Sequence, residues 1–137
     1  MVESTAATVS FCRYACSSDA LHACSVGGVV RKVPDGEILD CQAVLGANGF
    51  GCEPASAATI AGTRALMEDG TMEKSDRIVC ILTGHMLKDP DAIVEYHSLQ
   101  GKAFDERFAS YGVGRARFAN RPVTVDNDTD EIIKVMG

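Results

Sequence analysis

Apolar positions at helical spacing predict two neighbouring helices in the first half of the chain. The first helix is predicted over Asp35–Gly46, where acidic residues at the start suit the positive end of the helix dipole. Its apolar stripe consists of Ile38, Cys41, Val44 and Leu45. The second helix is predicted to start at Pro54, where proline fits the first turn, and to run to Met67, with Gly70 as its stop. Its first half is nearly all small residues, which suit close packing against a sheet or a flat ligand.

Extended segments alternate with these helices. Val29–Val33 predicts a short strand whose two charges suit an edge, and Arg121–Val125 predicts another. The continuous apolar run Arg77–Leu82 is typical of a strand buried on both faces of a parallel sheet. A helix is predicted from Asp89-Pro90 through Tyr96, and a capping box at Asp128–Glu131 predicts a last helix. Strand and helix thus alternate, which predicts an α/β fold with a mostly parallel sheet and flanking helices.

Two parts of the chain fit this pattern less well. Residues 98–120 are expected to be looser, around an aromatic group made of Phe104, Phe108 and Tyr111. The first residues fit no periodic template, and a helix over Ser18–Cys24 is the one element expected there. We therefore divide the chain into an N-terminal segment, 1–27, and one domain, 28–137. A chain of 137 residues is long enough for one compact domain with a modest core.

Composition excludes several classes of function. The net charge is -6 and no basic stripe offsets it, which argues against a nucleic-acid partner. The N-terminus lacks the pattern of a signal peptide, and no apolar run approaches the roughly 20 residues that span a bilayer. The sequence therefore predicts a cytoplasmic protein with no membrane partner.

The cysteines do not indicate a disulfide framework or a metal site. Nothing in the sequence directs the chain to an oxidising compartment, so Cys52 and Cys80 are predicted to be reduced, buried thiols. A zinc site is the alternative for the N-terminal group of Cys12, Cys16, His22 and Cys24. Its spacing lacks the paired short knuckles of structural zinc sites, so free thiols are expected instead.

Two side chains are candidates for a binding site. Thr83 follows the predicted buried strand, and ligands of open α/β sheets bind at that end of the strands. Its hydroxyl could face the nitrogen of a pyridine ring and leave that nitrogen unprotonated, or it could cap the following turn. Glu53 stands just before the second helix, where it could stabilise the helix dipole or form a charged pocket wall.

Three neighbouring features are weaker candidates. His85 could act as a base, although a lone loop histidine is more often a hydrogen-bonding or surface residue. Lys88 stands beside acidic residues that favour its charged form, so it is not expected to form a Schiff base. The glycine-rich segment Gly46–Gly51 superficially resembles a phosphate-binding loop, but a loop that ends a helix is the commoner explanation.

Two ordered motifs carry a family resemblance. Gly51-Cys-Glu-Pro-Ala-Ser-Ala-Ala-Thr-Ile-Ala-Gly62 and Val79-Cys-Ile-Leu-Thr-Gly-His-Met-Leu-Lys-Asp-Pro-Asp91 resemble the C-terminal part of threonine synthase. The resemblance covers roughly residues 28–137, is looser over 98–118 and is poor over the first 25 or so residues. It implies part of a fold of the tryptophan-synthase-β type, in a lyase of threonine biosynthesis that depends on pyridoxal phosphate. That family converts O-phosphohomoserine and water to threonine and phosphate.

The resemblance also implies roles for individual residues. Thr83 matches the hydroxyl that faces the pyridine nitrogen, and Glu53 matches an acid at the pocket wall of related enzymes. The lysine that holds the cofactor and the phosphate-binding glycine loop lie upstream in the family, and this chain contains neither. It is therefore expected to be a C-terminal fragment with no catalytic residue of its own, which needs a missing N-terminal half.

The alternative hypothesis is a noncatalytic α/β module that acts by self-association, as a homo-oligomer, or by partner binding. Loss of a domain would uncover an apolar surface around Ala57, Ala61, Ile81 and Leu82.

Overall fold

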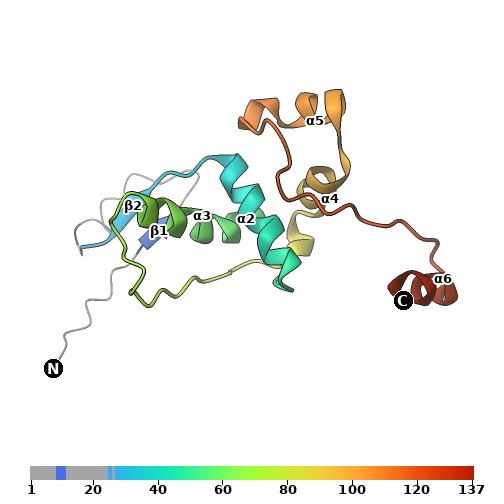
Figure 1. The fold of residues 1–137 in the computed structure, drawn as a ribbon, viewed down its shortest axis with the longest axis horizontal. Helices are drawn as coiled ribbons and strands as arrows, with labels where there is room; N and C mark the ends of the chain where they lie inside the picture. Colours follow the sequence, from blue (N-terminus) through green and yellow to red (C-terminus); the bar gives the residue numbers. More distant parts are fainter. Residues whose placement is uncertain (1–8, 12–24, 26) are drawn as a thin grey trace.

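The computed structural model describes residues 9–11, 25 and 27–137 (Figure 1). Strands β1 (Val9–Phe11) and β2 (Val29–Arg31) form a parallel ladder in which Val9 lies opposite Val29. The predicted strand at Val29–Val33 is thus confirmed in a shorter form. This two-stranded ladder is the sheet of the described residues, so the larger parallel sheet with flanking helices is not seen in them. The helix predicted over 18–24 and the group Cys12, Cys16, His22 and Cys24 lie outside the described residues.

The helices α2 (Asp35–Ala47) and α3 (Pro54–Glu68) confirm the two helix predictions and pack against each other. Pro54 occupies the first turn of α3, as expected. Most of the small residues in the first half of α3 are buried, and α3 packs mainly against α2, with fewer contacts to β1. Their apolar cluster consists of Val33, Ile38, Cys41, Cys52, Ala57, Ala58 and Ala61. The prediction that Ala57 and Ala61 are uncovered is therefore wrong, because α2 covers them.

The predicted buried strand Arg77–Leu82 is wrong. The segment is irregular, and no backbone hydrogen bond joins it to another described segment. Val79 is 88% exposed and Ile81 68% exposed. A continuous apolar run becomes a buried strand only where neighbouring strands and covering helices are present, and the described residues supply neither. The expectation that Ile81 and Leu82 are uncovered is confirmed, and the segment runs along one side of the molecule (Figure 1).

Beyond this segment, a short 3-10 helix, η1 (Met86–Lys88), leads into α4 (Pro90–Ser98), which confirms the predicted helix. The stretch 98–120 is more regular than predicted, because it contains α5 (Gly101–Phe108) and η2 (Ala109–Tyr111). The predicted aromatic group does form. It is part of a second core of Leu39, Ala43, Tyr96, Phe104, Phe108 and Val113, with Tyr111 packed against it.

The C-terminal residues lead away from this core. The predicted strand Arg121–Val125 is not formed, and Val123 is 68% exposed. Helix α6 (Thr129–Met136) is formed as predicted, and the Asp128 carboxylate accepts hydrogen bonds from the backbone N–H groups of Asp130 and Glu131. It lies apart from the other helices at the end of an extended stretch (Figure 1). Among the described helices, none has the length and apolar character needed to cross a membrane.

Candidate functional site

The structure brings the two sequence motifs together at the start of α3. The backbone N–H of Glu53 donates a hydrogen bond to the carbonyl of Gly84 at 3.0 Å, and Cys52 pairs with His85 in an isolated antiparallel bridge. These contacts join residues about thirty positions apart, and they place the loop after residue 82 against the first turn of the helix. Thr83 and Glu53, the two predicted site residues, therefore share one corner of the molecule.

Thr83 is exposed at this corner and faces Ser56, the third residue of α3. Its backbone N–H donates to the Ser56 hydroxyl at 2.9 Å, and the two hydroxyl oxygens lie 3.3 Å apart. The alternative in which Thr83 caps the following turn is not what the structure shows. That role belongs to His85, whose Nδ1 accepts a hydrogen bond from the backbone N–H of Leu87. His85 is thus the hydrogen-bonding loop residue that its sequence context favoured.

Glu53 is a buried carboxylate beside Gly84. Its side chain is 9% exposed and forms an ion pair of 2.8 Å with the ammonium group of Lys88, whose side chain is 68% exposed. A Cβ atom added at Gly84 would lie 2.1 Å from the Glu53 carboxyl carbon, so only glycine fits without displacing it. Glu53 precedes α3 but makes no side-chain cap hydrogen bond. Lys88 therefore pairs with Glu53 and not with the acids adjacent to it in the sequence. The exposed side chain of Lys88 is unlike that of a desolvated Schiff-base lysine.

The segment before Glu53 is fixed to α2. The Gln42 side chain donates a hydrogen bond of 2.7 Å to the carbonyl of Cys52, and both residues are buried. Burial, and secondarily the charge of Glu53, raises the pKa of the Cys52 thiol, so this cysteine is an inert core residue at neutral pH. Cys52 confirms the prediction of a buried thiol, whereas Cys80 is only half-buried.

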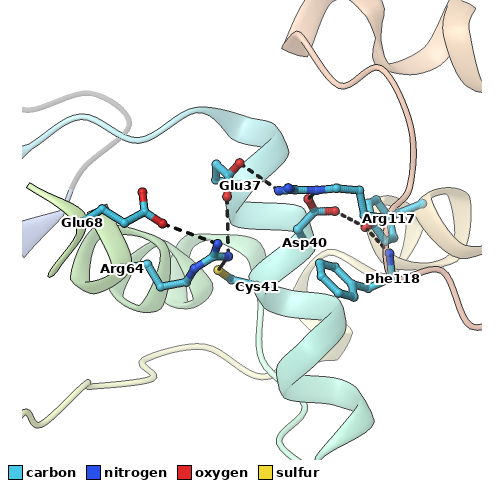
Figure 2. A network of polar contacts seen from close by, with 8 residues as sticks. Glu37, Asp40, Cys41, Arg64, Glu68, Arg117 and Phe118 are labelled. Carbon is cyan, nitrogen blue, oxygen red and sulfur yellow. Dashed lines mark hydrogen bonds and ion pairs between the residues drawn. The ribbon is translucent and has the colours of Figure 1, made fainter. Parts of the chain in front are cut away.

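A polar network holds α4 and the segment after α5 against α2 (Figure 2). The Asp40 carboxylate, 3% exposed, accepts hydrogen bonds from the Tyr96 hydroxyl and the Arg117 guanidinium. Burial and the hydrogen bond to Asp40 raise the pKa of Tyr96. The Tyr96 hydroxyl also accepts the backbone N–H of Phe118 at 3.3 Å. Because the site loop leads through η1 into α4, this network fixes the direction in which the chain leaves the site.

The network continues to α3 through Glu37, which lies between Arg117 and Arg64 (Figure 2). Arg64 Nη1 lies 3.7 Å from the Cys41 sulfur and donates to it, and its other nitrogen pairs with Glu68 at 3.8 Å. Burial raises the pKa of Cys41, and the hydrogen bond from Arg64 opposes that effect. These contacts join the two long helices, but they are remote from Thr83 and form no part of the candidate site.

The corner presents one hydroxyl with the chemistry to meet a ring nitrogen. Thr83 is an exposed residue whose backbone N–H and hydroxyl both contact Ser56, and a threonine hydroxyl can donate to a neutral ring nitrogen. The glycine segment after α2 does not fit a phosphate group, because its amides are used to end the helix, as in the Gly49 N–H to Gly46 carbonyl bond of 3.0 Å. Within the described ranges, no group of acidic, cysteine and histidine side chains is arranged to hold a metal ion.

Sequence reasoning missed three residues that build this region: Ser56, Asp40 and Arg117. Ser56 and Asp40 are polar residues among buried helical neighbours, and this pattern was the available signal. Their partners lie 27 and 77 positions away, and nothing local in the sequence indicates such pairs.

Comparisons with known proteins identify relatives of half the chain. Over 77 residues, 56% of its length, it is 48% identical to a threonine synthase of Methanocaldococcus jannaschii, and the match covers 18% of that relative. Over 70 residues, 50% of its length, it is 46% identical to a threonine synthase of Methanosarcina acetivorans, of which 17% is covered. A threonine synthase of Synechocystis sp. is 43% identical over 77 residues, with 20% of that protein covered. No family model matches the chain. The match thus spans about a fifth of the length of these curated relatives.

Proposed function

Because this chain carries a threonine-synthase-like segment, we propose that it forms one wall of a pyridoxal-phosphate site in a lyase of threonine biosynthesis. The observation that supports the proposal is the contact between the first turn of α3 and residues 83–85, which joins the two motifs of the resemblance at one corner. In the proposed reaction, O-phosphohomoserine and water give threonine and phosphate.

In this role, Thr83 orients the cofactor ring through its nitrogen. When bound, the cofactor acts as an electron sink, whose strength depends on the protonation of that nitrogen. A neutral hydroxyl partner leaves the nitrogen unprotonated, whereas a carboxylate partner would hold a proton there. Glu53 serves as the charged wall behind Gly84, and its pairing with Lys88 keeps the carboxylate away from the ring nitrogen.

The chain is proposed to work only with a complementing N-terminal part. In this proposal the lysine that holds the cofactor and the phosphate-binding loop come from that part, which also supplies neighbours for the exposed segment 77–82. With them, 77–82 becomes a strand of a mostly parallel sheet flanked by helices. The exposure of Val79 and Ile81 supports this view, since a segment so rich in β-branched residues is costly to leave in water.

Complementation tests the enzymatic proposal. The chain would be co-expressed with a Methanocaldococcus jannaschii threonine synthase truncated to remove its matching segment, in a bacterial strain that lacks threonine synthase. We expect growth without threonine from the pair and from neither part alone. Thr83→Ala should slow that growth, whereas Thr124→Ala, at an exposed threonine near the C-terminus, should not. Equal growth of the two variants, or no growth of the unsubstituted pair, would count against the proposal.

A cofactor titration tests whether the chain acts alone. With the purified chain and pyridoxal phosphate, we expect no new cofactor absorbance band, because Lys88 is exposed and paired with Glu53. Borohydride treatment followed by mass spectrometry should leave Lys88 unmodified beyond the level of Lys102, an exposed lysine on α5. A selective adduct on Lys88 would contradict the proposal that the covalent anchor lies elsewhere.

A second candidate function is a noncatalytic module that acts by self-association. The exposed apolar side chains of segment 77–82 favour it, because such surfaces promote association. Light scattering coupled to size-exclusion chromatography separates the two candidates. A monodisperse monomer over a range of concentrations would refute self-association. An oligomer that dissociates to monomers in the Ile81→Lys variant would support it.

A further inference from the structure

The hydroxyl of Ser56 is the most constrained polar group at the candidate site. Ser56 is 1% exposed, and its oxygen accepts the backbone N–H of Thr83 at 2.9 Å and that of Gly84 at 3.0 Å. The remaining contact of this oxygen within the described residues is the Thr83 hydroxyl, at 3.3 Å. One buried side chain thus holds two successive backbone amides and one side chain of the site loop.

Counting donors and acceptors fixes the direction of the contact between the two hydroxyls. A serine hydroxyl has two acceptor lone pairs and one proton to donate. The amides of Thr83 and Gly84 use both lone pairs of Ser56, so its proton is left for the Thr83 oxygen. In the opposite arrangement, with Thr83 as the donor, Ser56 would have to accept three hydrogen bonds. Its own buried proton would then be without a partner, which is costly.

This direction determines what Thr83 offers to a ligand. Since its oxygen accepts from Ser56, the proton of Thr83 is free to point to the exposed side of the corner. There it can donate to an acceptor atom, such as the lone pair of an unprotonated aromatic nitrogen. A protonated ring nitrogen has no lone pair in the ring plane, so it could not accept this proton and would have to donate to the remaining lone pair of Thr83 instead.

We propose that Ser56 is a positioning residue that fixes the loop at Thr83 and keeps the Thr83 proton available as a donor, and so favours the unprotonated form of a pyridine nitrogen. The identity of the ligand rests on the proposed function, whereas the direction of the hydrogen bond follows from the contacts of Ser56. Ser56 itself does not touch the ring: it acts through Thr83 and through the backbone at residues 83 and 84.

The first test measures the loop in the free chain. Amide hydrogen exchange would be followed by NMR in the unsubstituted protein, in Ser56→Ala and in Ser56→Thr. We expect Ser56→Ala to speed exchange at Thr83 and Gly84 at least tenfold and Ser56→Thr to restore most of the protection. The matched control is Thr59→Val, which removes a hydroxyl from the same helix and should leave both amides unchanged. Equal protection in Ser56→Ala would overturn the proposal.

The second test observes the direction of the bond and does not depend on any variant. In a neutron structure of the deuterated chain, the Ser56 deuterium should lie toward the Thr83 oxygen, and the Thr83 deuterium should point away from Ser56. A deuterium of Thr83 directed at Ser56 would overturn the proposal, even if the exchange results were as expected.

The third test extends to the cofactor in the complemented assembly. With ¹⁵N-labelled pyridoxal phosphate, the ring nitrogen should give an unprotonated chemical shift at neutral pH and a shift toward the protonated value in Ser56→Ala. A protonated nitrogen in the unsubstituted assembly would refute the selection. Failure of growth complementation, with the deuterium positions as expected, would instead refute the enzymatic proposal and leave the hydrogen-bond direction standing.

Discussion

A single methyl group at Gly84 should displace the Glu53 carboxylate from its position beside the site loop. In Gly84→Ala, the new Cβ atom would lie 2.1 Å from both the carboxyl carbon and one carboxylate oxygen of Glu53. The backbone of Gly84 is outside the left-handed region, so alanine is acceptable there on conformational grounds. The carboxyl group must therefore retreat by about 1.3 Å to reach the ordinary contact distance of 3.4 Å.

The cost follows from what Glu53 loses when it moves. Overpacking of a close contact costs about 1–3 kcal/mol. The lost ion pair with Lys88 contributes no more than about 1 kcal/mol, because that lysine is largely exposed and screened by solvent. Since the obstructing atoms belong to the end of a flexible side chain, we expect the lower part of the range, about 1–2 kcal/mol. For a domain of this size that corresponds to a decrease in Tm of about 3–8 °C.

Urea unfolding followed by circular dichroism measures this loss. The matched control is Gly114→Ala, where a Cβ atom would meet nothing within 4 Å. The urea concentration at the unfolding midpoint should not fall in this variant. In a Glu53→Ala background, Gly84→Ala should cost less than about 0.5 kcal/mol, because the obstructing carboxylate is gone. A stability of Gly84→Ala equal to that of the unsubstituted chain, or an undiminished cost in the Glu53→Ala background, would refute the proposed packing.

Three further predictions concern other parts of the structure. Tyr96→Phe removes a buried hydroxyl that donates to Asp40 and should lower the unfolding free energy by about 1–2 kcal/mol in urea, whereas an unchanged value would show that the network contributes nothing. Asp128→Ala removes the cap of α6 and should fray that helix, at a cost of about 1 kcal/mol to its local stability, with the NMR shifts of α3 unchanged. Burial lowers the pKa of His97, so the folded state resists protonation, and stability should be full above about pH 6.5 and fall as the pH decreases below it. His97→Gln should flatten that dependence, and an equal slope in the variant would rule out His97 as its source.

The elements that could be predicted from the sequence are those whose signals are local. Helices α2, α3 and α4 were indicated by apolar spacing, by proline in a first turn and by acidic residues at a start, and all of these act within a few residues. Helix α5 was missed because its start at Gly101 lacks a capping side chain, although Phe104 and Phe108 stand at the four-residue spacing of a helix.

The segment 77–82 shows where local reasoning fails. Its composition describes what the segment prefers to contact, namely apolar neighbours on two faces, but contains no information on whether those neighbours are present. The candidate site divides in the same way. Thr83 and Glu53 were candidates from their places beside a predicted strand end and a predicted helix start, and the resemblance then implied roles for them. Their partners Ser56 and Lys88 emerged only when the chain was folded, since contacts across 27 and 35 positions have no signal in a single sequence.

The chain on the two sides of Thr83 is held by different contacts, and under the proposed function this difference separates ligand recognition from assembly. Toward the C-terminus, the loop is fixed by the Ser56 hydroxyl, by the Glu53–Gly84 backbone bond and by the Cys52–His85 bridge, all of which are made within this chain. Toward the N-terminus, the contact at Cys80 is a side-chain one, 3.6 Å from the Thr63 hydroxyl, and the backbone of 77–82 makes no bond to another described segment. The geometry around the Thr83 hydroxyl is therefore set by contacts within this chain, before the proposed complementing part binds. It follows that a partner which covers 77–82 should slow amide exchange there while leaving exchange at Thr83 and Gly84 nearly unchanged. A large gain of protection at those two residues would show that the loop at Thr83 is not preformed.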